Sequence, residues 1–492
     1  MARCHCQEQD SEGGSATETQ SGESSVVAPQ SKDPAPVTWD LAAKILPAAT
    51  GSFIEWYEFG IYGYESSYIT ANFFGNGHGG SLGTWAGFAI TFAFRPLGGA
   101  FFGHLSDKFG RKPAMQLTIA LMLATTVLQG VLPSFVVCDE AWGWVGLVLL
   151  LFCRMLQGLS AGGELSAAAV YISEISPKQH LGLNLAWLSA TGTFGSFAIA
   201  ALVVYLVESS LSPEAMMRWG WRLPYLTSAI PGAAIILSRR CLEESPDFEE
   251  IVKARIEAAG PASLEAGARP TEPMSPVCEV FAHHKLPVVV GTLGIAGVGA
   301  IWYVPPIYGM QVIQQKDSLP ASAVTMSEIF PYLLPAVLAL FAGMLVDAWG
   351  ACKVHVLSLL SCGILAPVPL FYWWTHVDRD FEVKALLIGQ SIMGLLMALT
   401  TALYLWLVEL FPVHVRTTGV SIAYNLGIGV FGGLGPLVCD AASSWLPSTG
   451  LMSPPAAYTA LTSVISLVVV AGSWALARCG KMTLTHIRAT PY

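Results

Sequence analysis

The chain has 492 residues, of which 53% are hydrophobic and only 12% are charged, and its mean hydropathy is +0.55. A soluble globule of this composition would expose far too much apolar surface, so the bilayer is the expected solvent for most of the chain. The formal net charge is −9 and no basic stripe is present, which argues against a nucleic-acid partner.

Runs of about 20 or more mostly apolar residues predict twelve membrane-spanning helices. Their approximate bounds are 42–72, 82–106, 114–134, 144–173, 183–207, 220–239, 286–313, 323–346, 353–374, 383–409, 418–439 and 457–479. Residues 1–40 are polar and lack the apolar core of a signal peptide, so they are predicted to be a disordered tail. We therefore expect an all-α membrane protein with six-helix bundles at 41–239 and 286–479, a linker at 240–285 and a short tail at 480–492.

The distribution of Lys and Arg predicts the orientation of these helices. With both termini in the cytoplasm, the inner tails and loops hold 18 of the 25 Lys and Arg. The outer loops and their edges hold Arg218, Arg222, Lys316, Arg379 and Lys384, while Arg95 and Arg154 lie within spans. An excess of basic residues marks the cytoplasmic side, so both termini and the linker are predicted to be cytoplasmic. Without an organellar signal, the plasma membrane is the default location.

A short polar hairpin between the second and third spans occurs twice in the chain. Its first copy runs from Gly103 to Lys112 and contains Asp107, Gly110 and Arg111; its second copy has Gly343, Asp347 and Gly350 at the same offsets. The fourth span likewise ends in Glu174-Ile-Ser-Pro and the tenth in Glu409-Leu-Phe-Pro. These repeats predict a duplicated fold in which both motifs lie at the inner ends of helices.

Intramembrane charges are confined to the first half, since the aligned positions of the second half are apolar. The acids and bases concerned are Glu55, Glu58, Glu164, Arg95 and Arg154. Charges within a bilayer usually line a cavity or pair with one another, because burying one costs about 2.5 to 3.5 kcal/mol even on the mildest scale. At about 100° per residue, Glu55, Glu58, Tyr62 and Glu65 share one face of span one. A second polar face on span four carries Arg154, Gln157, Glu164 and Tyr171, and we expect both faces to line one central cavity.

The hairpin from Gly103 to Lys112 resembles the signature loop of the major facilitator superfamily. Segments such as Gly51 to Gly63, Phe94 to Gly99 and Gln157 to Glu164 are similar to the metabolite:proton symporters, a subfamily with carriers of proline and betaine, α-ketoglutarate, citrate and shikimate. The resemblance implies two six-helix halves that alternate in exposing a central site to either side. Two departures are Glu58, where the subfamily usually has Asp, and His180-Leu181, where it has a basic pair.

These residues and the resemblance lead to three sets of expected site residues. Proton coupling is assigned to Glu55, Glu58 and Glu164. Substrate binding is assigned to Arg95, Trp56, Tyr62, Arg154 and Gln157, because Arg binds carboxylates and aromatic faces attract ammonium groups. A gating role is assigned to Gly103, Asp107, Gly110, Arg111, Asp347, Glu174, Glu409 and Arg416.

The sequence thus favours symport of a proton with a small carboxylated or zwitterionic metabolite, with the lipid bilayer as the other partner and a monomer as the working unit. No catalytic triad, phosphate-binding loop or dinucleotide fingerprint is present, so neither enzymatic activity nor a cofactor is predicted. The ten cysteines lack metal-ligand spacing, and no metal is expected. Two alternatives remain: a proton-independent facilitator for a sugar or organic cation, and a non-transporting receptor on the same scaffold.

Overall fold

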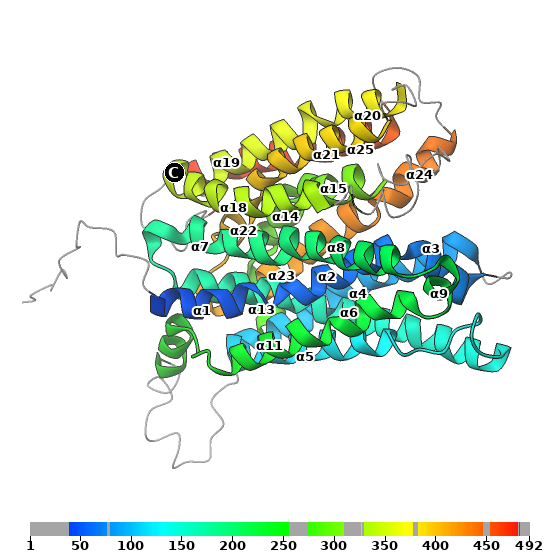
Figure 1. Cartoon of the computed structure of the whole chain (residues 1–492). Helices are drawn as coiled ribbons and strands as arrows, with labels where there is room; N and C mark the ends of the chain where they lie inside the picture. Colours follow the sequence, from blue (N-terminus) through cyan, green and yellow to red (C-terminus); the bar gives the residue numbers. More distant parts are fainter. Residues whose placement is uncertain are drawn as a thin grey trace, which may run out of the picture. The chain divides into compact units, whose positions relative to one another are not determined.

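The computed structural model describes residues 39–75, 79–254, 274–308, 326, 329–376, 382–445, 453–480 and 482. Within these ranges the chain is helical and contains no strand. Residues 1–38 of the predicted disordered tail and residues 255–273 of the predicted linker lie outside them, and the predicted domain bounds stay predictions. Figure 1 shows the long helices running side by side.

The first six spans are built from the helices before residue 241. Span one consists of α1 (Trp39–Ala49), α2 (Ser52–Tyr64), α3 (Ser66–Ile69) and η1 (Thr70–Phe74), and spans two, three and four are α4 (Gly80–Phe109), α5 (Arg111–Gln129) and α6 (Glu140–Ile175). Span five consists of η2 (Lys178–His180), α7 (Leu181–Trp187), η3 (Leu188–Phe194) and α8 (Gly195–Ser210). Span six contains α10 (Leu223–Thr227) and α11 (Ala229–Arg240). The short α9 (Pro213–Arg218) precedes span six.

The other six spans follow the short helix α13 (Pro276–His283). Span seven consists of α14 (Lys285–Gly294), α15 (Ala296–Tyr303) and η5 (Val304–Tyr308), span eight is α18 (Ile329–Trp349), and span nine consists of α19 (Ala351–Ser358), η6 (Leu359–Leu365) and α20 (Pro367–His376). Span ten consists of α21 (Glu382–Met397), η8 (Ala398–Thr401) and α22 (Ala402–Val408). Span eleven consists of η9 (Val413–Val415), α23 (Arg416–Leu426), η10 (Gly427–Gly433) and α24 (Gly435–Trp445), and span twelve is α25 (Pro454–Arg478).

Eight of the described helical segments are long and apolar enough to cross a membrane by length and composition alone. Helical residues 39–74, 80–109, 111–129 and 223–240 correspond to the other four predicted spans. The fold class is therefore confirmed: an all-α membrane protein with twelve spans in two halves. Span one starts at Trp39, a few residues earlier than predicted, whereas span six starts where predicted, with the 3-10 turn η4 (Gly220–Arg222) that leads directly into α10.

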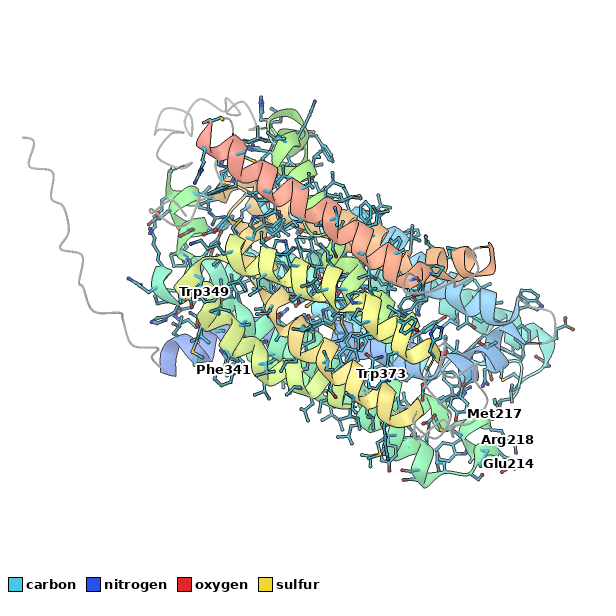
Figure 2. The ribbon with its side chains drawn as sticks, turned by 90° about the horizontal axis from the view of Figure 1, so that it is seen from above. Glu214, Met217, Arg218, Phe341, Trp349 and Trp373 are labelled. Atoms are coloured by element: carbon cyan, nitrogen blue, oxygen red, sulfur yellow. The ribbon has the colours of Figure 1, made fainter. Side chains whose placement is uncertain are left out.

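Large apolar side chains cover the outside of the helices, as a lipid-facing surface requires. Phe341 and Trp349 on α18 are 59% and 55% exposed, and Leu97 and Phe101 on α4 are similarly exposed. Figure 2 shows Phe341 and Trp349 at the edge of the helical body, whereas Glu214 and Arg218 of the polar α9 lie at one end of it. The apolar exterior and polar ends match immersion in a bilayer.

Glycines bring α4 and α6 into backbone contact and so fix the position of Arg95. A Cβ atom at Gly98 would collide with the Leu159 carbonyl, one at Gly158 with the Thr91 carbonyl, and one at Gly162 with the Arg95 carbonyl. Small residues at helix interfaces allow such approach within membranes. The backbone of α4 at Arg95 is therefore held directly against α6.

We expect Gly162→Ala to destabilise the protein, because the added methyl group has to push the α4 backbone away. Overpacking of this kind costs about 1 to 3 kcal/mol. The midpoint of thermal unfolding of the purified protein in detergent measures the effect. Gly472→Ala in α25 is the matched control: its Cβ would meet nothing within 4 Å, so an unchanged or higher midpoint is expected. Equal midpoints for the two variants would contradict the proposed close contact.

Candidate functional site

The first buried ion pair lies where the two halves of the fold meet. Arg95 of α4 and Glu55 of α2 pair at 2.6 Å between Nη2 and Oε1, and neither side chain is exposed. The Nε of Arg95 also donates to Oδ1 of Asn425 on α23, at 3.2 Å. Asn425 in turn donates to the Gly162 carbonyl at 2.6 Å. The guanidinium of Arg95 is thus tied to an acid of its own half and to an amide of the other half.

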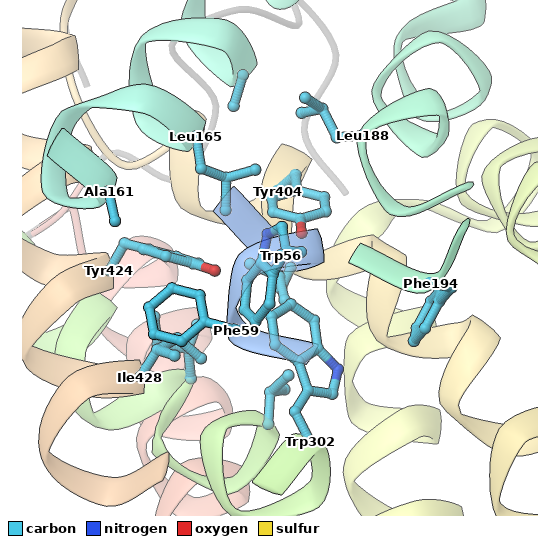
Figure 3. Close-up of a cluster of buried hydrophobic side chains, with 14 of the residues drawn as sticks. Trp56, Phe59, Ala161, Leu165, Leu188, Phe194, Trp302, Tyr404, Tyr424 and Ile428 are labelled. Atoms are coloured by element: carbon cyan, nitrogen blue, oxygen red, sulfur yellow. The ribbon is translucent and has the colours of Figure 1, made fainter. Parts of the chain in front are cut away.

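Aromatic rings from both halves enclose this pair. The Arg95 guanidinium lies 5.7, 5.5 and 5.6 Å from the ring centroids of Trp56, Phe59 and Phe92. Trp302 packs edge-on against Trp56 at 5.7 Å, and Tyr303 against Phe92 at 5.3 Å. Figure 3 shows Trp56 and Phe59 surrounded by Trp302, Tyr404 and Tyr424, so the second half contributes the opposite wall. We call these seven rings the aromatic shell.

Several polar atoms within and beside this shell are buried without a hydrogen-bond partner among the described residues. They are Oε2 of Glu55, Nη1 of Arg95, Nε1 of Trp56 and the hydroxyl groups of Tyr303 and Tyr424. A buried polar group that makes no hydrogen bond loses free energy, so unpaired groups concentrated in one place are unusual in a purely structural core. They supply both donors and an acceptor for a small polar ligand.

A second buried ion pair joins Glu58 of α2 to Arg154 of α6. Gln129 contacts both partners: its Nε2 lies 3.4 Å from Glu58 Oε1 and its Oε1 accepts from Arg154 at 3.3 Å. The Arg154 guanidinium also lies 3.9 Å from the ring centroid of Tyr62, whose hydroxyl donates to the Thr84 carbonyl at 2.9 Å. This cluster involves side chains of the first half only, in contrast to the Arg95 site.

Gln157 lies one turn beyond Arg154 on α6. Its Nε2 donates to Oγ1 of Thr126 at 3.3 Å, and its Oε1 is buried without a described partner. The structure therefore associates Tyr62, Arg154 and Gln157 with Glu58, and Trp56 with Glu55 and Arg95. Their roles in substrate binding stay predictions.

Glu164 pairs with Arg239 of α11 at 2.5 Å and accepts from Oγ1 of Thr118. The remaining N–H groups of Arg239 donate to the carbonyls of Pro47, Ala48 and Met115 at 2.7 to 3.0 Å. The sequence predicts Glu164 on the polar face of span four that carries Arg154, whereas its partner Arg239 is the last residue of the predicted span six. With every donor of Arg239 used, this cluster ties α1, α5, α6 and α11 together, and a coupling role for Glu164 stays a prediction.

At the end of the helices that is predicted to be cytoplasmic, called the inner end below, each hairpin Asp caps a helix of the opposite half. Asp107 accepts from the backbone N–H groups of Thr417 and Thr418 in the first turn of α23, at 3.3 and 2.8 Å. Asp347 accepts from Gly182 and Leu183 in the first turn of α7, at 2.6 and 2.9 Å. An acid at a helix N-terminus pairs with unsatisfied donors and with the helix dipole.

Glycines permit these two caps. Gly103 allows α4 to approach α23, since its Cβ would lie 2.8 Å from the Thr418 Cα, and Gly343 allows α18 to approach α7 in the same way. The turns after α4 and α18 place Gly110 and Gly350 at φ of +114° and +93°, which only glycine adopts without strain. The two copies of the hairpin therefore make equivalent contacts between the halves.

An ionic cluster accompanies the first copy of the hairpin. Glu174 accepts from Arg111 at 3.1 Å, from Arg416 at 3.3 Å and from the Ser245 hydroxyl at 2.6 Å. Arg111 also pairs with Asp107 at 3.1 Å. In the second copy Glu409 is buried at the end of α22, but Ala351 stands at the position that matches Arg111.

The start of the linker completes this cluster, which sequence reasoning did not foresee. Glu244 accepts from the backbone N–H groups of Arg111 and Lys112 at 2.9 and 3.2 Å, and so caps α5. Asp247 lies 3.5 Å from Arg416, and burial together with the negative charge of Glu174 raises the pKa of its carboxyl. The signal was the Leu242-Glu-Glu-Ser-Pro246 run, whose Ser and acids can cap helices.

The comparisons with known proteins agree with this architecture. The family described as "Sugar (and other) transporter" matches residues 44–280. The putative proline/betaine transporter of Staphylococcus haemolyticus (strain JCSC1435) is 31% identical over 437 residues, which cover 87% of this chain and 86% of that protein. The ectoine/proline transporter ProP of Corynebacterium glutamicum is 32% identical over 446 residues, covering 87% and 83%.

Solved structures show the same fold. The proton:xylose symporter XylE bound to 6-bromo-6-deoxy-D-glucose superposes with a TM-score of 0.70 at 15% identity, covering 91% of this chain and 98% of that one. The fold, the buried ion pairs and these relatives define a membrane transporter and not an enzyme. The chain belongs to the major facilitator superfamily, in its metabolite:proton symporter subfamily. The predicted family is therefore confirmed, and a non-transporting receptor finds no support.

The caps at the inner end yield a prediction about the balance between conformations. Asp347→Ala removes one cap between the halves and should favour inner opening about fivefold, because a cap contributes about 1 kcal/mol. Asp107→Ala removes the equivalent cap on α23 and should have a similar effect. Distances between spin labels on the inner ends of the two halves, in reconstituted protein, measure the shift.

Asp139→Ala is the matched control, because Asp139 caps α6 within one half by accepting from Trp142 N at 3.0 Å. This variant should lose stability without a shift in the label distances. The same distance distribution in Asp347→Ala and in the unaltered protein would contradict a gating role for the caps.

Proposed function

We propose that the protein takes up a small zwitterionic or carboxylated metabolite of the proline/betaine type together with a proton, by alternating access. The observation that carries this proposal is the Glu55–Arg95 pair, buried inside the aromatic shell where the two halves meet. We also propose that the protein lies in the plasma membrane with both termini in the cytoplasm, as the distribution of Lys and Arg predicts.

The chemistry of the aromatic shell supports a zwitterion over a neutral substrate. The Arg95 guanidinium presents an unpaired Nη1 that suits a carboxylate. Trp56, Trp302 and Tyr303 offer faces that attract an ammonium group. Relatives whose names include proline, betaine and ectoine agree with this choice, since each of those compounds carries both charges at neutral pH.

Competition for Arg95 provides a physical basis for coupling. A substrate carboxylate that binds the guanidinium has to displace Glu55, at least in part. The released Glu55 would then be a buried acid without a cation, and such a group takes up a proton because its ionised form is too costly in an apolar environment. Substrate and proton therefore favour each other's binding in this scheme.

In this proposal, the contacts between the halves change as the site turns from one side of the membrane to the other. Asn425 and the rings of Trp302 and Tyr303 belong to the second half, whereas Glu55 and Arg95 belong to the first. Rocking of the halves about this boundary changes the surroundings of Arg95 while the caps at the inner end break or form. A facilitator that does not use protons would have the same motion but no dependence on the pH gradient.

Transport by purified protein in liposomes tests the substrate assignment. We expect uptake of labelled proline or betaine by the unaltered protein, and at least a thirtyfold loss in Arg95→Gln, since a buried charge pair is worth about 2 kcal/mol or more. Arg218→Gln, which alters an exposed Arg of α9, should transport normally. Equal uptake by both variants would exclude Arg95 from substrate binding, and uptake that ignores the pH gradient would favour the facilitator.

Glu58→Gln tests proton coupling. The variant should still exchange internal for external substrate, because exchange needs no net movement of protons. Its accumulation of substrate should fall about tenfold for each unit of pH gradient, since each coupled proton contributes that factor. The ratio of internal to external substrate at steady state gives the result, with the exposed Glu214→Gln as the control. Unchanged accumulation would remove Glu58 from the coupling role.

A further inference from the structure

A third buried acid of span one, Glu65, lies at an interruption of the helix. α2 ends at Tyr64 and α3 begins at Ser66, and Glu65 between them has φ −95° and ψ 14°. The π-helical turn η1 follows within the same span. Such turns and breaks within spans are frequent at functional sites.

The carboxyl group of Glu65 has no counter-charge among the residues that the structure describes. Its side chain is completely buried, and neither carboxyl oxygen has a hydrogen-bond partner among the described residues. Glu55, Glu58 and Glu164 are equally buried or nearly so, but each pairs with an Arg. Glu65 thus differs from the other intramembrane acids that the structure describes.

The titratable groups that face Glu65 increase this contrast. They are Glu208 of α8, Tyr57 of α2, Tyr68 of α3 and Tyr225 of α10. None of them is a cation, and Glu208 carries a negative charge when ionised. The hydroxyl group of Tyr225 is itself buried and without a described hydrogen-bond partner. An ionised Glu65 would be isolated in an apolar environment beside another acid.

We propose that Glu65 is a second proton-binding site, occupied in this conformation and emptied when the outer part of span one moves. A buried carboxyl group without a cation is neutral, because its charged form cannot be solvated. The site is distinct from the Glu58 pair, since seven residues of helix separate the two by about 10 Å. The proposal rests on proton-coupled transport and extends it, because two protons would accompany each substrate.

Movement of the outer part of span one provides the switch. Span one beyond the interruption packs against α4, where Thr70 and Thr84 share a hydrogen bond of 2.7 Å. Displacement of α3 and η1 would expose the Glu65 carboxyl to water, where its ionised form is stable. Proton release then accompanies the conformational change.

Infrared spectroscopy of the full-length protein in liposomes tests the protonation state without any substrate. The carbonyl stretch of a protonated carboxylic acid should be present at neutral pH in the unaltered protein and weaker by one group in Glu65→Gln. Glu208→Gln, which removes the half-buried neighbouring acid, should keep the band. An identical band in Glu65→Gln and the unaltered protein would overturn the proposal, because Glu65 would then be ionised.

Accumulation of proline or betaine in the same liposomes tests whether the proton is carried. Glu65→Gln should keep exchange but lose about tenfold in accumulation for each unit of pH gradient, and Glu208→Gln should lose nothing.

Unchanged accumulation in Glu65→Gln would overturn the proposal while leaving proton coupling intact. If the unaltered protein showed no pH-driven uptake, the proposed function would fail, and the infrared band would still decide whether Glu65 binds a proton. If Glu65→Gln does not fold, the infrared and accumulation measurements are made on Glu65→Leu instead.

Discussion

The interior of this membrane protein tolerates an ionised side chain only beside a counter-charge, and this constraint organises its chemistry. In the part of the chain that the structure describes, Arg95, Arg154 and Arg239 each neutralise one buried acid of the first half. The second half contributes Asn425 and neutral aromatic rings to the same boundary. Any event that separates an acid from its Arg, such as binding of a carboxylate, therefore has to be balanced by a proton.

The duplication of the hairpin accounts for the contacts at the inner end more fully than it accounts for the Arg95 site. The two Asp caps need only an acid, a helix N-terminus and a glycine that permits close approach, and both halves retain these features. The cluster of Arg111, Glu174 and Arg416 depends on Arg111, and the second copy has Ala351 at the matching position. The two Asp caps are thus repeated, whereas this cluster includes an Arg that the second copy does not carry.

The sequence predicted features that depend on local pattern, namely the spans, the hairpins, the glycines and the acidic face of span one. It did not predict which Arg each acid meets. Arg239 lies at the polar edge of span six, where a basic residue indicates the orientation of the span in the membrane. Only tertiary packing brings Arg239 into contact with Glu164. Trp302 and Tyr303 meet Trp56 across the boundary between the halves, and this contact depends on how the halves pack. Glu65 lies on the predicted face, and its lack of a cation among the described residues is likewise a tertiary property.

In the proposed scheme, coupling depends on how firmly Arg95 is held. Close contact of α4 with α6 at Gly158 and Gly162 restrains the backbone of Arg95, while Glu55, Asn425 and the surrounding rings contact its guanidinium. A substrate carboxylate would therefore compete with Glu55 for the same cation. Asn425 holds the Nε of the same guanidinium from the second half, which makes the competition sensitive to the separation of the halves. A mobile cation in this position could satisfy both anions, and substrate binding would then proceed without a proton.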